Sequence, residues 1–218
     1  MRVEIWSDVV CPWCYVGTRR FSAALDRFDA DVDVSYRAFE LDPTVPPGGM
    51  DLADYLARKF GSPAALDRVH NRLAQVGAEA GIDFRWDGKR RVNTFDAHRL
   101  GVWVEGAGGA DARAALEQRL FRAYFTENLD VADHGVLAGL AAEVGLDPGA
   151  AAEALATGAG AEAVRAEEAQ ATELGISAVP TFVIEGRWAI PGAQDVDTFL
   201  KILGTAAERL APLPPHHE

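Results

Sequence analysis

Cysteine, lysine and long apolar runs are all scarce in this chain of 218 residues. Its two cysteines, Cys11 and Cys14, are separated by two residues, and a disulfide that closes so short a loop barely constrains the unfolded chain. No stretch approaches the roughly 20 apolar residues of a membrane-spanning helix. The first residues are charged and alternating, unlike a secretory signal, so we expect a cytoplasmic protein.

Acidic residues outnumber basic ones, which gives a formal net charge of -12. An acidic surface repels phosphate backbones and lipid headgroups, so we expect no nucleic acid and no membrane partner. Hydrophobic residues make up 49% of the chain, enough for a large buried core. The oligomeric state is left open by these properties.

Hydrophobic spacing divides the chain into three parts. Alternation predicts strands over residues 2–6 and 32–38, and helical spacing between them predicts a βαβ unit. Residues 50–174 show helical spacing and no convincing strand. A β-hairpin is predicted over residues 181–190, followed by a last helix that Asp195 could cap.

This order predicts an α/β protein with a thioredoxin-like fold, interrupted by a large all-helical insertion between its βαβ and ββα halves. The thioredoxin-like domain would comprise residues 1–48 and 175–210, and the helical domain residues 49–174. The two distant halves must then pair in one sheet.

The Cys-Pro-Trp-Cys motif fits either a zinc site or a redox site until its surroundings are considered. A structural zinc site needs four ligands, and the chain has no further cysteine. Only two histidines are close together, His216 and His217, in a proline-rich tail that we expect to be solvated. We therefore predict no metal site.

The redox interpretation assigns a role to each residue of the motif. Cys11 would lie at the start of a helix, where unpaired N–H groups and the helix dipole favour its thiolate as the nucleophile. Cys14, one turn further, would be buried and would resolve the mixed disulfide. Pro12 suits the first helical turn, and Trp13 offers a flat apolar face to a substrate. Because Trp13 adds no positive charge, we expect a less oxidising couple than a motif with histidine would give.

A second part of the site comes from the far half of the chain. A thioredoxin-like core brings the loop before the late hairpin against the cysteine motif, and this loop contains Val179 and Pro180. We predict that Pro180 is cis and that the Val179 backbone is available to pair with an extended substrate.

The motifs together resemble the DsbA-like thiol–disulfide oxidoreductases of the FrnE type in the thioredoxin superfamily. The resemblance rests on Ser7-Asp8-x-x-Cys11-Pro12-Trp13-Cys14, Asn93-Thr94 with Ala97-His98-Arg99, and Gly175-Ile176-x-x-Val179-Pro180-Thr181-Phe182. It spans nearly the whole chain. It implies an enzyme that oxidises or isomerises protein disulfides, with protein or small-molecule thiols and disulfides as its partners.

The same resemblance extends to 2-hydroxychromene-2-carboxylate isomerases and kappa-class glutathione transferases, which have serine in place of the first cysteine. In those relatives the segments of Asn93, Gln194 and Asp195 contact glutathione, which leaves glutathione open as a redox partner. We expect no bound cofactor. For Asn93, Thr94 and Asp195 we favour helix capping instead. We expect His98 to pack between lobes, and residues 89–91, a basic run, to form a solvated turn.

Three functions follow as alternatives. The first is disulfide exchange through Cys11. The second is a glutathione-dependent isomerase or transferase acting on a small aromatic compound. The third is a chaperone whose apolar cleft holds unfolded clients without using either cysteine.

Overall fold

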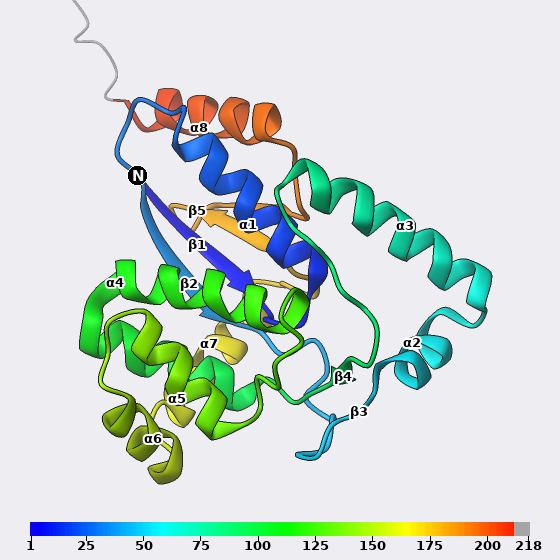
Figure 1. Cartoon of the computed structure of the whole chain (residues 1–218). Helices are drawn as coiled ribbons and strands as arrows, with labels where there is room; N and C mark the ends of the chain where they lie inside the picture. The colour runs from blue at the N-terminus through cyan, green and yellow to red at the C-terminus, as the bar shows by residue number, and fades with distance from the viewer. Residues whose placement is uncertain (212–218) are drawn as a thin grey trace, which may run out of the picture.

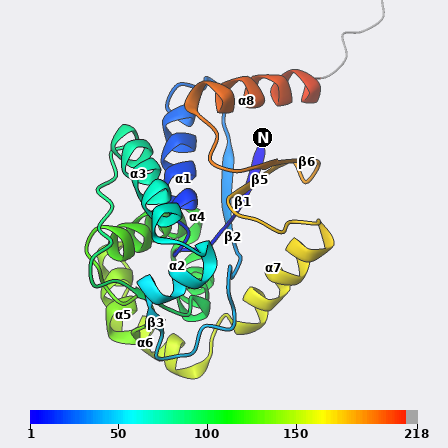
Figure 2. The same cartoon turned by 90° about the vertical axis from the view of Figure 1, so that its right-hand side faces the viewer.

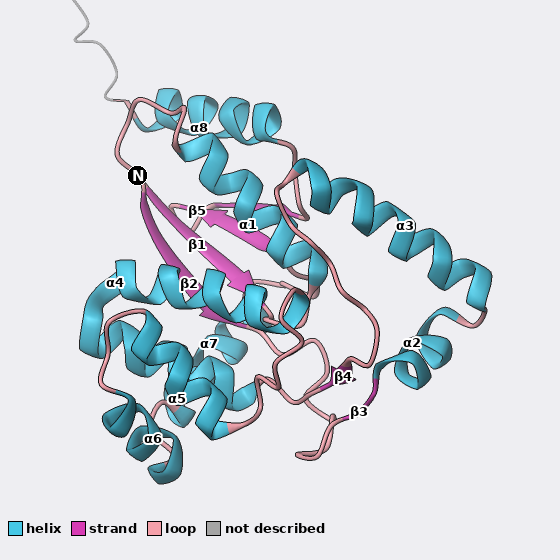
Figure 3. Ribbon diagram, viewed as in Figure 1, coloured by secondary structure: helices cyan, strands magenta, loops and turns pink. Residues whose placement is uncertain are grey.

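A four-stranded sheet forms the centre of the molecule in a computed structural model, which describes residues 1–211 apart from the side chains of residues 60 and 63 (Figure 3). His216 and His217 lie outside the described residues. The strands, in the order β2-β1-β5-β6 across the sheet, are β1 (Arg2–Ser7), β2 (Asp33–Ala38), β5 (Thr181–Ile184) and β6 (Trp188–Pro191). The N-terminal strand is therefore a central strand.

The two distant halves of the chain meet along β1. β1 runs parallel to β2 through the crossover helix α1 (Pro12–Leu25), and β5 pairs antiparallel with β1 so that Phe182 lies opposite Ile5. Both halves thus share one sheet (Figure 1). The predicted thioredoxin-like fold with a helical insertion is confirmed.

The two faces of the sheet are covered by different helices. Successive side chains of a strand point to opposite faces. Val3 and Ile5 accordingly pack in one apolar cluster with α1 and the last helix, α8 (Val196–Leu210), whereas Trp6 packs on the other face near α7 (Ala161–Glu173). Figure 2 shows α7 and α1 on opposite sides of the sheet. Strand β5 is buried on both faces, whereas Ala189 and Pro191 of the edge strand β6 are exposed.

The segment between the two halves contributes most of the helices. They are α2 (Leu52–Phe60), α3 (Pro63–Glu79), α4 (Phe95–Phe125), α5 (His134–Glu143), α6 (Pro148–Thr157) and α7. The expected breaks are present, because Asp147 caps α6 and Gly158 ends it in the left-handed conformation. The domain bounds themselves stay a prediction, and α7, which the predicted insertion includes, packs on the sheet.

The expectation of no strand between residues 50 and 174 is wrong in one detail. β3 (Met50–Asp51) and β4 (Arg90–Arg91) form a two-stranded antiparallel ribbon at the base of α2. Strands of two residues are too short to show an alternating pattern, so periodicity could not reveal them.

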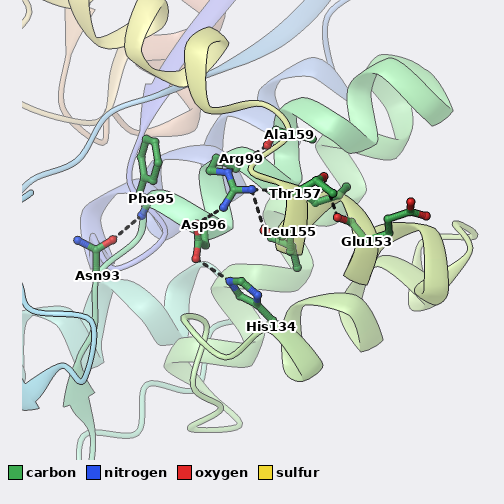
Figure 4. Close-up of polar contacts among 10 residues, drawn as sticks. Asn93, Phe95, Asp96, Arg99, His134, Glu153, Leu155, Thr157 and Ala159 are labelled. Carbon is green, nitrogen blue, oxygen red and sulfur yellow. Dashed lines mark hydrogen bonds and ion pairs between the residues drawn. The ribbon is translucent and has the colours of Figure 1, made fainter.

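The side chain of Arg99 links the start of α4 to the end of α6 through hydrogen bonds (Figure 4). Its buried guanidinium donates hydrogen bonds to the backbone carbonyls of Ala154, Leu155 and Ala159, at 2.9–3.1 Å. It also pairs with Asp96, whose other oxygen lies 2.7 Å from Nε2 of His134. The Ala154 and Leu155 carbonyls also accept backbone N–H groups of the residues that follow α6, so Arg99 reinforces a helix end that the backbone already caps.

Replacing Arg99 with methionine is therefore expected to destabilise the protein by about 1–3 kcal/mol, because it removes three buried hydrogen bonds from a charged donor. Urea unfolding of the two proteins measures the difference. Arg68→Met, on the exposed face of α3, is the matched control. Equal effects of the two substitutions would show that the α6 carbonyls do not depend on Arg99.

Candidate active site

The cysteine motif joins the end of β1 to the first turn of α1. Cys11 is the N-cap residue of α1 in an extended conformation, and Pro12 occupies the first turn. The Cys11 N–H donates to the Asp8 carbonyl at 2.9 Å, and the Cys14 N–H donates to the Cys11 carbonyl at 3.0 Å. The structure thus places the motif between strand and helix, as the sequence predicts.

The two cysteines differ in their surroundings. Cys11 is 4% exposed and borders a cavity, whereas Cys14 is 0% exposed. Burial raises the pKa of the Cys14 thiol well above its ordinary value, and the neighbouring Cys11 sulfur raises it further. Cys14 therefore stays protonated at neutral pH.

The loop before β5 lies against Cys11, as expected. The Val179–Pro180 peptide bond is cis, and Cys11 Sγ donates a hydrogen bond to the Val179 carbonyl at 3.5 Å. Gly17 on α1 allows the loop to come so close, because a Cβ at that position would lie 3.0 Å from Pro180 Cγ. No local pattern around Gly17 indicates this role.

A cavity of about 230 Å³ opens beside Cys11. On one side it is bounded by the motif and its neighbouring loop, through Cys11, Pro12, Trp13 and Val179. The opposite walls come from α2, α3 and the end of α4, and most of their side chains are apolar. The predicted substrate-binding residues Pro12, Trp13 and Val179 thus share one cavity, while Pro180 is buried and does not line it.

A buried acid–base pair lies beneath the motif. Asp8 is 0% exposed and His98, from α4, is 1% exposed, with His98 Nε2 3.6 Å from Asp8 Oδ1. That separation is within the range of an ion pair and too long for a hydrogen bond. Asp8 Oδ2 also accepts the Leu41 N–H at 2.8 Å. Neither residue is among the predicted site residues, although Asp8 belongs to the Ser7–Cys14 motif.

Each partner favours the charged form of the other. Burial alone would raise the pKa of Asp8, but His98 outweighs it and the pKa is lowered. Burial alone would lower the pKa of His98, but the Asp8 carboxylate reverses the shift and the pKa is raised above 6.5. Glu117 and Arg113 of α4 act on His98 in opposite directions.

The basic run at residues 89–91 is not a solvated turn, contrary to our interpretation. Lys89 and Arg91 are buried, and only Arg90 is exposed. Lys89 Nζ donates to the Tyr124 carbonyl and lies 4.5 Å from the centre of the Tyr124 ring, and burial lowers its pKa to about 8. Pairing in β4 turns alternate side chains inward, which a count of charges does not reveal.

Several residues considered as glutathione contacts have other partners. Asp195 caps α8 by accepting the Thr198 N–H at 2.8 Å, so the capping interpretation is confirmed there. Asn93 accepts the Phe95 N–H and donates to the Val45 carbonyl. Thr94 is the N-cap residue of α4 but its side chain makes no capping bond, and Gln194 donates to the Pro191 carbonyl.

A Cys-Pro-Trp-Cys motif at a helix start, adjoining a cis-proline loop that leads into the neighbouring strand of a four-stranded sheet, is typical of the thioredoxin-fold class. Comparison with known families agrees with this class. The model of the DSBA-like thioredoxin domain matches residues 2–204, and the chain belongs to this family.

Known relatives match along nearly their whole length. A probable DsbA oxidoreductase from Streptomyces coelicolor is 34% identical, with a TM-score of 0.89 over 99% of this chain and 93% of that one. The Bacillus subtilis protein YwbO is 28% identical over 93% of this chain and 96% of its own. DsbM from Pseudomonas aeruginosa, a cytosolic disulfide reductase, shares the fold at 24% identity and a TM-score of 0.70, over 97% of this chain and all of its own. The finer FrnE type stays a prediction.

Residues 1–211, which the structure describes, lack two further features. None of the helices there is long and apolar enough to cross a membrane. The same part of the chain contains no group of three or more histidine, cysteine or acidic side chains that could hold a metal ion.

Proposed function

We propose that this chain catalyses thiol–disulfide exchange with Cys11 as the attacking residue and Cys14 as the resolving one. The observation that carries the proposal is their asymmetry. Cys11 borders a cavity at a helix N-terminus, where unpaired N–H groups stabilise an anion, and Cys14 is buried with a raised pKa.

Exchange would proceed in two displacements. The Cys11 thiolate attacks one sulfur of a substrate disulfide, a bond forms between them, and the other substrate sulfur leaves as a thiolate. Cys14 then loses its proton and attacks Cys11 Sγ, which breaks the mixed disulfide and releases the second thiolate. The substrate gains two electrons and the protein is left with a Cys11–Cys14 disulfide. Run in reverse, the same steps oxidise a dithiol.

The loop of Val179 would hold the substrate during these steps. Its carbonyl already accepts from Cys11 Sγ, so a peptide that pairs with this backbone lies directly beside the reacting sulfur. We propose protein or small-molecule disulfides as substrates and a thiol such as glutathione as the agent that resets the site. The cytoplasm, where such thiols are kept reduced, is the compartment that fits the proposal.

A turnover assay with insulin tests the proposal. The reduced protein should reduce insulin disulfides catalytically when a small thiol is supplied, and mass spectrometry should find a Cys11–Cys14 disulfide after a single turnover. Equilibration with glutathione then gives the reduction potential, which we expect to be less oxidising than that of a motif with histidine. A protein that neither reduces insulin nor forms the disulfide would overturn the proposal.

The apolar cavity beside Cys11 also favours a second candidate, a glutathione-dependent isomerase or transferase of a small aromatic compound. Such an enzyme would bind glutathione without any change in the oxidation state of its cysteines. Calorimetry with glutathione, combined with a thiol count before and after, separates the two functions. The existing hydrogen bonds of Asn93 and Asp195 favour exchange, since both side chains are already engaged.

A further inference from the structure

The cavity beside Cys11 contains positive charge but no compensating acid. Its lining residues among the described part of the chain include Lys59 and Arg91 and no carboxylate, although the whole chain has a net charge of -12. His70 also lines the cavity, stacked on Trp86 with ring centres 4.6 Å apart, and burial lowers its pKa so that it is neutral at pH 7. The local charge is therefore opposite in sign to that of the protein.

Arg91 is the unusual member of this lining. It is 4% exposed, and its guanidinium lies 5.0 Å from the centre of the Tyr55 ring. Within residues 1–211 it forms no ion pair, and its Nε has neither a hydrogen-bond partner nor contact with solvent. Asp8 and Asp42 feel its charge, which lowers the pKa of each, but neither is paired with it.

Other buried arginines of the molecule have partners. Arg99 donates to three backbone carbonyls, and Nε of Arg113 pairs with Glu117 at 2.9 Å, although the two terminal nitrogens of Arg113 have no hydrogen-bond partner. A guanidinium cannot lose its proton to escape burial, and an unpaired buried charge is costly. Arg91 thus has the properties of a group whose partner is supplied by a bound molecule.

We propose that the cavity binds a small disulfide or thiol with an apolar body and a carboxylate, and that Arg91 pairs with the carboxylate. This inference rests on the proposed exchange function and names its substrate class. The apolar walls, which include Trp13, Leu73 and Trp86, take the ring or hydrocarbon part. Planar guanidinium and carboxylate groups form two parallel charge-assisted hydrogen bonds, which fix the orientation of the substrate sulfur beside Cys11.

Two aryl disulfides serve as probes. Dithionitrobenzoate carries a carboxylate on each ring, and dithiodipyridine carries none. With either probe, the Cys11 thiolate attacks one sulfur and displaces one aryl thiolate, and Cys14 displaces the second from the mixed disulfide. The protein loses two electrons, the probe gains them, and the released thiolate gives a colour that reports the rate.

The measurement is the ratio of the two second-order rate constants, so that any change in the Cys11 thiolate itself cancels. Arg91→Gln is expected to lower the ratio of dithionitrobenzoate to dithiodipyridine about tenfold, the effect of one lost charge-assisted hydrogen bond. Arg91→Lys should recover part of the loss. Arg68→Gln, which removes the same charge from an exposed position on α3, should leave the ratio unchanged.

An unchanged ratio in Arg91→Gln, or an equal fall in Arg68→Gln, would overturn the inference while leaving disulfide exchange intact. A wild-type protein that reacts with neither probe would overturn the proposed function as well. A second measurement needs no variant: naphthoate should quench the fluorescence of Trp13 and Trp86 at lower concentration than naphthyl methanol does. Equal affinity for the two compounds would contradict the role of Arg91.

Discussion

Cys11→Ser is expected to reduce the rate of insulin disulfide reduction to the uncatalysed background, a loss on the order of 1,000-fold or more. A serine hydroxyl is not ionised at neutral pH and does not attack sulfur, and Cys14 cannot substitute for it. Cys14 is fully buried, so it cannot contact a substrate, and its raised pKa keeps it protonated, so it is not a thiolate. The turnover assay described above measures the effect.

Serine is nearly the size of cysteine, so the variant should fold normally. Its urea unfolding curve should match that of the reduced wild-type protein, which separates lost chemistry from lost structure. Full exchange activity in a folded Cys11→Ser protein would show that the attacking residue has been misassigned.

Asp8→Ala is expected to destabilise the protein by about 3–5 kcal/mol, the cost of removing one partner from a buried ion pair. The substitution leaves His98 without its partner and the Leu41 N–H without its acceptor. Denaturant unfolding at neutral pH measures the loss. Asp29→Ala, at an exposed position, should change the free energy of unfolding by no more than about 0.5 kcal/mol. A similarly small effect of Asp8→Ala would show that the pair does not stabilise the fold.

The same pair predicts a dependence of stability on pH. The pKa of His98 is raised in the folded state, so its contribution is fully present below pH 6.5 and is lost as the pH rises through the folded-state value. The pKa of Asp8 is lowered, so its contribution is present above pH 3.8 and is lost only as the pH falls through the folded-state value. The charged groups that act on His98 are Asp8, Glu40, Glu117 and Arg113.

Unfolding of wild-type protein and His98→Gln at several pH values tests this dependence. The difference in their free energies of unfolding should be larger below pH 6.5 than in alkaline solution. A difference that stays constant, or that grows with rising pH, would mean that His98 is buried without its charge.

Most of what could be predicted from the sequence depends on local pattern. The alternation of Val3 and Ile5 identifies β1, and a cysteine followed by Pro12 identifies the start of α1, because both signals lie within a few residues. Pro180 lies close to Cys11 in space, although most of the chain separates the two residues in sequence. This proximity was predictable only because the order of strands and helices specifies a known arrangement of the sheet.

The features that escaped prediction depend on contacts between distant segments. Nothing near Asp8 indicates that His98 will approach it from α4, and nothing near Arg91 indicates that β3 will pair with β4 and turn its side chain inward. Charged residues in sequence are normally assigned to the surface, and these are exceptions because tertiary packing buries them. Both exceptions lie next to the cysteine motif, where departures from local rules are expected at a functional site.

The most direct test of the central claim uses Cys14→Ser, which keeps the attacking residue and removes the resolving one. When this variant is mixed with a disulfide substrate and the products are digested for mass spectrometry, one substrate thiol should be found attached to Cys11. The adduct should persist, because no thiol remains in the protein to displace it. A variant that forms no adduct at Cys11 would contradict the assignment of Cys11 as nucleophile and Cys14 as resolver.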